Sequence, residues 1–284
     1  SPDDQRKLGY ACSDLLGWGT IGRRNIAILE ALRWGAEIIV TIDDDNIPLD
    51  RSYFAHFRTW LEYPFSGLCV DGMNRWFDVG QWIDPPSSHR GFPIQTQSSL
   101  GFRAVVDAKI GVAAGICLGD PDVSAVTRIA QPSLARFASE PLRAGIVVNP
   151  TTHVTVFNSQ NTAFLRELAP CFLMVPQFGR YDDIFASLIA QRVMRDNGLH
   201  VHFGHPFVWQ QRNPHNLQRD LQAEIWGMDH VLAFKHFLEQ AKMPTGYVVD
   251  KVRAIYAQMQ DQIWMPAGVS ELGLAWCEDC STVL

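Results

Sequence analysis

Three consecutive aspartates, Asp43–Asp45, follow a short apolar run, Glu37–Ile42. The run is rich in β-branched residues, a pattern that predicts a buried strand. We expect the aspartates to lie where a central strand leaves the sheet, which is where open α/β sheets bind ligands. If the chain stays extended there, Asp43 and Asp45 point to one side and Asp44 points to the other.

Two carboxylates on one side of the chain favour a bound cation. Unit charges about 4 Å apart interact by roughly 1 kcal/mol in water and about 4 kcal/mol in a partly buried site. Carboxylate oxygens suit Mg²⁺ or Mn²⁺, which keep open positions for waters and substrate phosphates. We therefore predict that Asp43 and Asp45 hold Mn²⁺ or Mg²⁺ against a nucleotide diphosphate. A solvated acidic turn is the alternative.

Three arginines are candidates for binding phosphate. Arg23 and Arg24 lie in the first turn of a predicted helix, Gly22–Trp34, where the helix dipole does not favour a cation. Phosphate binding would explain their position, and solvent exposure is the alternative. Arg90 lies within Tyr63–Phe102, which is rich in Pro, Gly, Trp and Arg. We expect this stretch to be irregular, and compact domains keep such long loops mainly for function.

Two further groups of polar residues follow apolar segments. Asp120 and Asp122 come after Val105–Leu118 and form a second pair of carboxylates. A polar run follows the strand-like segment His153–Phe157, and its amides and hydroxyls suit the recognition of sugar hydroxyls. The capped start of a helix is the alternative for this run. Its candidate binding residues are Asn158, Gln160 and Asn161.

Asp182 and Asp183 open a predicted helix that ends at Asn197. Aspartate at the start of a helix caps free N–H groups and interacts favourably with the helix dipole. One aspartate meets that need, so the other is free to act as a base or to hold a substrate hydroxyl. Asp182 and Asp183 are therefore the candidate catalytic residues.

His215 follows two strand-like segments, His200–Phe203 and Pro206–Trp209. It is a candidate metal ligand because a neutral imidazole binds divalent ions, although an isolated histidine is more often a surface residue. The pattern over Leu217–Leu284 is helical. We expect these helices to close the core.

Composition sets bounds on the class of protein. The 284 residues carry a formal net charge of -6, which disfavours a general electrostatic hold on nucleic acid or anionic membrane. No apolar run is long enough to span a membrane, and the polar start is unlike a signal peptide. The six cysteines are scattered except for Cys277 and Cys280, so we expect free thiols and a cytoplasmic protein. We interpret this C-x-x-C pair as incidental.

Six short motifs occur in the order TIDDDN, RGFP, GDPD, NSQNTAF, GRYDD and WQQRNPHN. In this order and spacing the chain resembles, over nearly its whole length, the STELLO-type glycosyltransferase-like proteins of plants and their microbial relatives. It is more distantly similar to the reversibly glycosylated polypeptides that act as UDP-arabinopyranose mutases. The resemblance implies a GT-A fold in which Asp43–Asp45 bind a divalent metal and the donor diphosphate. It places Asp182 and Asp183 near the acceptor or as catalytic carboxylates.

The chain departs from the mutase pattern at two positions. Gln97 stands where the mutases carry the arginine that bears the transient sugar, which argues against self-glycosylation. Gln210 stands where they have a histidine after the last strand, which leaves His215 as the substitute ligand. GT-A domains also place their first strands ahead of the metal-binding motif, so we expect that the front of the family domain is absent from this sequence.

We therefore predict an α/β protein whose GT-A-like domain, a Rossmann-type mixed sheet flanked by helices, spans 1–216, with a helical extension over 217–284 packed on it. The predicted activity is metal-dependent transfer of a sugar from a nucleotide-diphosphate donor, above all a UDP-sugar, to a hydroxyl acceptor. Three alternatives stay open: a haloacid-dehalogenase-like phosphatase, a UDP-sugar mutase and a non-catalytic scaffold. Ile47 argues against the phosphatase, which has Thr or Val at that position of its motif.

Overall fold

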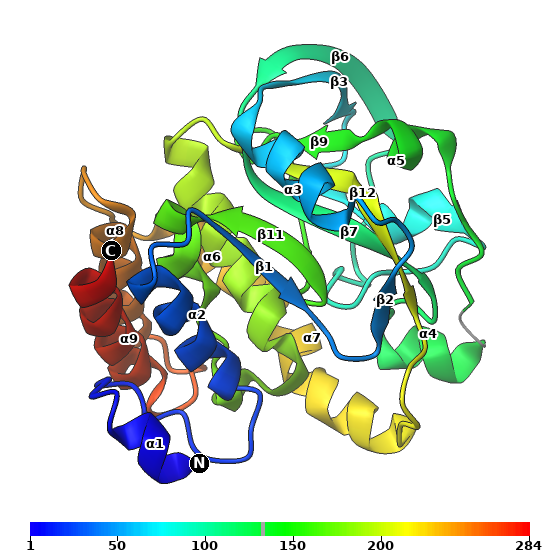
Figure 1. Cartoon of the computed structure of the whole chain (residues 1–284). Helices are drawn as coiled ribbons and strands as arrows, with labels where there is room; N and C mark the ends of the chain where they lie inside the picture. Colours follow the sequence, from blue (N-terminus) through cyan, green and yellow to red (C-terminus); the bar gives the residue numbers. More distant parts are fainter. Residues whose placement is uncertain (132–133) are drawn as a thin grey trace.

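The structure, a computed structural model, describes residues 1–131 and 134–284 and contains an eight-stranded mixed sheet flanked by helices (Figure 1). The strands of this sheet are β1 (Ile38–Ile42), β2 (Asn46–Pro48), β3 (Phe65–Asp71), β6 (Gly101–Ala108), β7 (Ile110–Gly119), β9 (Ile146–Val148), β11 (Asn161–Leu165) and β12 (His200–Gln210). They lie in the order β1, β11, β7, β12, β9, β3, β6, and β2 pairs with β12. Two small sheets join β4 (Trp76–Phe77) to β10 (Val154–Thr155) and β5 (Ile83–Asp84) to β8 (Phe137–Ala138).

Helices cover both faces of the large sheet. The α-helices are α1 (Pro2–Arg6), α2 (Arg23–Arg33), α3 (Tyr53–Glu62), α4 (Ala125–Ala130), α5 (Glu140–Ala144), α6 (Asp182–Asp196), α7 (Leu217–Gln240), α8 (Val248–Met259) and α9 (Val269–Val283). The 3₁₀ helices are η1 (Val79–Trp82), η2 (Arg166–Phe172) and η3 (Pro176–Tyr181). On one face α3 packs over β7, β11 and β12, and Phe57 and Leu61 enter the smaller hydrophobic core there. On the other face α6 lies in the larger core, and α7 and α8 pack against it.

The directions of three strands determine where the functional loops meet. β1 is antiparallel to β11, β11 is antiparallel to β7, and β7 is parallel to β12. The carboxyl ends of β1, β7 and β12 therefore lie at the same edge of the sheet, together with the first residues of β11. Loops that leave parallel strands at one edge are the usual ligand-binding loops of open α/β sheets.

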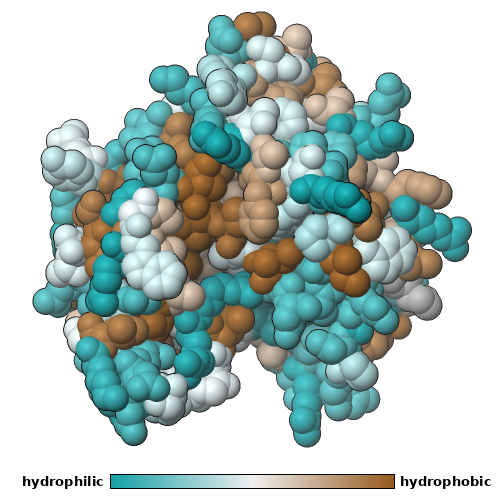
Figure 2. Space-filling model, in the orientation of Figure 1, coloured by the Kyte–Doolittle hydropathy of each residue, from teal (hydrophilic) through white to brown (hydrophobic). Residues whose placement is uncertain are grey.

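The predicted central position of the strand after Glu37 is wrong. β1 lies at the edge of the described sheet, with β11 as its neighbour. Its side chains alternate between the two cores: Ile39 enters the larger one, whereas Ile38 and Val40 pack against the smaller one. An edge strand covered on both faces has the same continuous apolar pattern as a central strand. Figure 2 shows hydrophobic residues on the surface over β1.

Two other expectations differ from the structure. The region expected to be irregular, Tyr63–Phe102, contains the seven-residue strand β3, which pairs with β6 and buries Cys69 and Val70. The apolar spacing over Asp50–Leu61 predicts an amphipathic helix that buries Phe54, Phe57 and Leu61, but the helix begins at Tyr53 rather than at Asp50. Tyr53 is therefore 3% exposed, whereas Phe54, expected in the core, is 69% exposed.

The cysteines are free thiols, as expected. Cys277 and Cys280 are buried within α9, and burial raises the pKa of both thiols above the ordinary value. Both therefore pack in the core as small apolar side chains. No helix in the described ranges is long and apolar enough to cross a membrane.

His202 in β12 is a fully buried imidazole whose two nitrogens have no hydrogen-bond partner in the described structure. It stacks on Trp60, with ring centroids 4.4 Å apart. Burial, with a smaller effect of His205, lowers the pKa of His202 to about 3. The pKa of an unfolded histidine is about 6.5. Between pH 6.5 and pH 3 the unfolded chain therefore binds a proton at His202 that the folded chain does not bind, so the free energy of unfolding decreases as pH falls below about 6.5.

We expect the free energy of unfolding to drop by about 2 kcal/mol between pH 7 and pH 5 through His202 alone. Urea denaturation of the parent and of His202→Met at both pH values measures this, because the variant should lose that part of the pH dependence. His236, exposed on α7, provides the control His236→Gln. An unchanged pH dependence in His202→Met would show that His202 is not a buried neutral base.

Candidate functional site

Loops at the carboxyl ends of β1 and β12 surround a cavity of about 260 Å³ with the residues before β11 and the start of α6. The residues that line it are Ile21, Arg24, Asp43, Asp45, Arg90, Asp122, Ser159, Gln160, Gly179, Arg180, Asp182, Asp183, Gln210, Arg212 and His215. Figure 2 shows a notch at the lower edge of this face of the molecule, with hydrophilic residues gathered on its right flank. The lining is dominated by arginines and aspartates that are far apart in the sequence.

The aspartate triplet forms a turn, whereas an extended chain was expected. The Asn46 N–H donates to the Asp43 carbonyl at 3.1 Å, which closes the turn. Asp43 and Asp45 nevertheless both line the cavity, whereas Asp44 is exposed. The two carboxylates that were expected to share a side therefore do so because of the turn.

The donor set of Asp43 and Asp45 fits a cation that arrives with its own ligands. Asp43 Oδ1 accepts from Arg24 Nη2 at 2.6 Å, and both Asp45 oxygens lie 3.4 Å from Gln210 Nε2. No group of three or more His, Cys, Asp or Glu side chains in the described residues is arranged to hold a metal. A pair of carboxylates can still suffice, because Mg²⁺ is commonly held by only one or two carboxylates, with waters and substrate phosphates completing its shell.

His215 lies at the same cavity and is oriented by a carboxylate. Its Nδ1 is 2.9 Å from Asp220 Oδ2. Histidines that bind metals usually make such a contact with their second nitrogen, which leaves Nε2 for the ion. The contact orients the ring of His215, whose side chain is 27% exposed, but in the described residues His215 does not complete a group of three metal-binding side chains with Asp43 and Asp45.

The two candidate catalytic aspartates have different surroundings. Asp183 accepts from both terminal nitrogens of Arg90, at 2.9 and 3.0 Å, and from the Ser159 N–H at 3.1 Å. Asp182 accepts from the Asp183 N–H at 2.8 Å. Burial and, second, the charge of Asp183 raise the pKa of Asp182 to about 7. A carboxylate with a pKa near neutrality suits a general base, whereas Asp183 is engaged in holding Arg90.

Arg90 is placed between two carboxylates. It is 6% exposed, and its nitrogens pair with Asp122 at 2.7 Å and with Asp183 at 2.9 Å. Its bonds are thus directed at protein groups, although it borders the cavity. Burial acts to raise the pKa of Asp122, but the charge of Arg90 outweighs it and holds that pKa well below the ordinary value.

The remaining sequence candidates are divided between the cavity and the protein interior. Arg24 and Gln160 line the cavity, whereas Arg23 is exposed outside it. Asn161 is buried: its amide donates to the Pro206 carbonyl and accepts from a tyrosine hydroxyl. Asn158 donates to the Asp122 carboxylate at 3.1 Å. Asp120, outside the cavity lining, pairs with Arg128 and Arg212.

Sequence reasoning missed two arginines at this cavity. Arg180 donates to the fully buried Glu224 at 3.0 Å, and Arg212 is 7% exposed at its side chain. Both lie inside motifs that were recognised, GRYDD and WQQRNPHN. The available signal was the arginine in each motif, which lies beside the acidic or amide residues that were considered.

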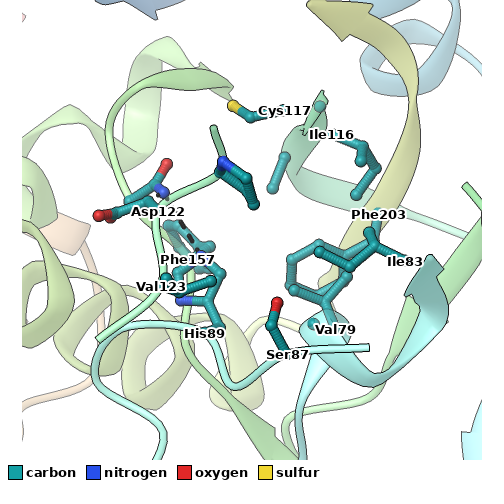
Figure 3. Close-up of a pocket in the computed structure, with 15 residues that line it drawn as sticks. Val79, Ile83, Ser87, His89, Ile116, Cys117, Asp122, Val123, Phe157 and Phe203 are labelled. Carbon is teal, nitrogen blue, oxygen red and sulfur yellow. Dashed lines mark hydrogen bonds between the residues drawn. The ribbon is translucent and has the colours of Figure 1, made fainter. Parts of the chain in front are cut away.

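A second, smaller cavity of about 50 Å³ lies behind Asp122. Figure 3 shows Asp122 at its edge, with Phe157 and Val123 on one side and Phe203 on the other. The buried Ser87 hydroxyl has no partner in the described structure. This volume suits one or a few water molecules rather than a sugar ring, since a water occupies roughly 30 Å³ of liquid.

No model of a known protein family matches this chain, and a search of curated proteins returns no significant match. What the site can do must therefore be judged from its own residues.

Proposed function

We propose that this protein is a metal-dependent glycosyltransferase with a GT-A-like fold that moves a sugar from a nucleotide-diphosphate donor to a hydroxyl acceptor. The observation that carries the proposal is the convergence of Asp43, Asp45 and Asp182 on one cavity, although Asp182 is far from the other two in the sequence. The proposal thus combines two carboxylates for a cation with a third carboxylate of near-neutral pKa.

Each residue has one role in this proposal. A divalent ion held by Asp43 and Asp45, with waters and substrate phosphates completing its shell, would supply positive charge to the departing diphosphate. Asp182 accepts the proton of the acceptor hydroxyl, which it does in its ionised form at pH values above about 7. Asp183 and Arg90 hold the start of α6, and with it Asp182, in place.

Release of UDP from UDP-sugars tests the proposal without knowledge of the acceptor, because water can act as a poor acceptor. We expect a panel of UDP-hexoses and UDP-pentoses, incubated with Mn²⁺, to contain at least one donor that yields UDP, and we expect EDTA to abolish the release. Absence of UDP release from every donor, with hydrolysis of a simple phosphate ester instead, would favour the phosphatase.

The mutase alternative lacks a supporting residue at the cavity. Gln97, which occupies the position of the sugar-bearing arginine, is exposed and is not among the residues that line the cavity. Mass spectrometry of the protein after incubation with UDP-sugar separates the two activities. Transfer without a covalent adduct supports the glycosyltransferase, and a stable sugar adduct on the chain supports the mutase.

A further inference from the structure

Arg212 is a buried arginine at the cavity with poorly bonded nitrogens. Its Nε has no hydrogen-bond partner in the described ranges, and its Nη2 reaches Gln210 Oε1 only at 3.5 Å. Asp120 and Asp122 each lie 3.7 Å from one of its nitrogens, longer than a charge-assisted hydrogen bond. Because a guanidinium has five N–H donors, Arg212 retains bonding capacity for an anion.

Arg90 shows that this deficit is not a general consequence of burial. Its side chain is also 7% exposed, yet it pairs with Asp122 at 2.7 Å and with Asp183 at 2.9 Å. The carboxylate of Asp122 is thus directed at Arg90 and is left at a long distance from Arg212. Arg90 thus has two carboxylates at hydrogen-bond distance, whereas the carboxylates that pair with Arg212 lie 3.7 Å away.

Arg180 has a similar deficit beside Arg212. Its Nε donates to Glu224 at 3.0 Å, but its terminal nitrogens lie 3.7 Å from Asp220 and 3.9 Å from Asp122. Burial lowers the pKa of Arg212 from its ordinary value. The charges of Asp122 and Asp120 oppose this effect, and those of Arg128 and Arg180 add to it. A buried charge without close partners is costly, and an anion in the cavity would remove that cost.

We infer that Arg212 and Arg180 form a diphosphate-binding subsite in the cavity that Asp43 and Asp45 also line. The inference rests on the proposed function, since it gives the diphosphate of the nucleotide sugar a place between the cation and the two guanidinium groups. Guanidinium matches phosphate oxygens in paired N–H···O bonds. The cavity of about 260 Å³ is several times the roughly 30 Å³ that a water molecule occupies.

Titration calorimetry with Mg²⁺ and two probes, inorganic pyrophosphate and UDP, tests the subsite. We expect Arg212→Gln to raise the Kd of both probes by about 10- to 100-fold, the loss typical of charge-assisted bonds. Arg212→Lys should raise it less, because the charge stays and the paired geometry is lost. The matched control is Arg23→Gln, which removes an exposed arginine outside the cavity and should leave both Kd values unchanged.

The outcomes separate this inference from the proposed function. Unchanged affinity in folded Arg212→Gln overturns the subsite, and so does a parent protein that binds neither probe at millimolar concentration. If Arg212→Gln does not fold, Arg212→Lys decides in the same way. Pyrophosphate binding that depends on Arg212, without UDP release from any UDP-sugar, supports the subsite and contradicts only the glycosyl transfer.

Discussion

Asp182→Asn is expected to lower the turnover of UDP-sugar by about 10²- to 10⁴-fold, the usual contribution of a general base. The amide oxygen of Asn can still accept from the Asp183 N–H, which Asp182 Oδ1 accepts at 2.8 Å, so the start of α6 is preserved. Donor binding should therefore persist. Turnover with saturating UDP-sugar and the Kd of UDP measure the two quantities separately.

The dependence of this effect on pH distinguishes a base from a structural residue. Since the pKa of Asp182 is raised to about 7, the rate of the parent should increase with pH up to that value and then level off. The same raised pKa means that the folded state binds its proton more tightly than the unfolded state, so Asp182 lowers stability as pH rises from about 4 to 7. Asp182→Asn should be at least as stable as the parent at pH 8. A variant that is less stable and fully active would contradict the role.

Arg90→Met is expected to destabilise the fold by about 3–5 kcal/mol, because it leaves two buried carboxylates without their cation. Asp122 and Asp183 are 4% and 8% exposed at their side chains, so little solvent reaches the two charges. Urea denaturation at pH 7 measures the loss. The control is Arg23→Met on the exposed start of α2, which should change stability by less than about 0.5 kcal/mol.

Acid should reduce the deficit of Arg90→Met. In the parent, Arg90 holds the pKa of Asp122 below its ordinary value, so the interaction is present above that value and is lost as pH falls. In the variant, Arg90 no longer opposes the effect of burial on Asp122, so the pKa of that carboxyl rises and its protonation becomes more favourable in weak acid. The difference between the two proteins should therefore be smaller at pH 4.5 than at pH 7. A difference independent of pH would indicate lost packing instead of lost charge pairing.

Local patterns were sufficient to predict the helices next to the site. The helix expected over Gly22–Trp34 is α2, and the one expected to end at Asn197 is α6, which ends at Asp196. In α2 the spacing of apolar residues fixes the buried face, whereas α6 is buried on nearly all sides. Gly35 and Gly198 follow the two helices with positive φ, which only glycine adopts readily. The glycines that mark the helix ends lie within one turn of those ends, so a local pattern is enough to predict them.

The arrangement of the site depends on contacts that a local pattern does not contain. The preference for Asp182 over Asp183 comes from Arg90, 93 residues earlier, whose guanidinium binds Asp183. The status of Arg212 likewise depends on the long distance to Asp122. The edge position of β1 follows from strand pairing, which the apolar run alone does not specify.

The most direct test of the account is the binding of UDP with and without Mn²⁺, followed by calorimetry for the parent, Asp43→Asn/Asp45→Asn and the control Asp44→Asn. Asp44 is exposed and lies outside the cavity lining, so its variant changes charge without changing the site. We predict that Mn²⁺ tightens UDP binding at least about tenfold, or about 1.4 kcal/mol, in the parent and in Asp44→Asn, and has little effect in the double variant. Equal affinity with Mn²⁺ and with EDTA in the parent, or an unchanged response to Mn²⁺ in the double variant, would contradict the central claim that these two carboxylates hold a cation for the diphosphate.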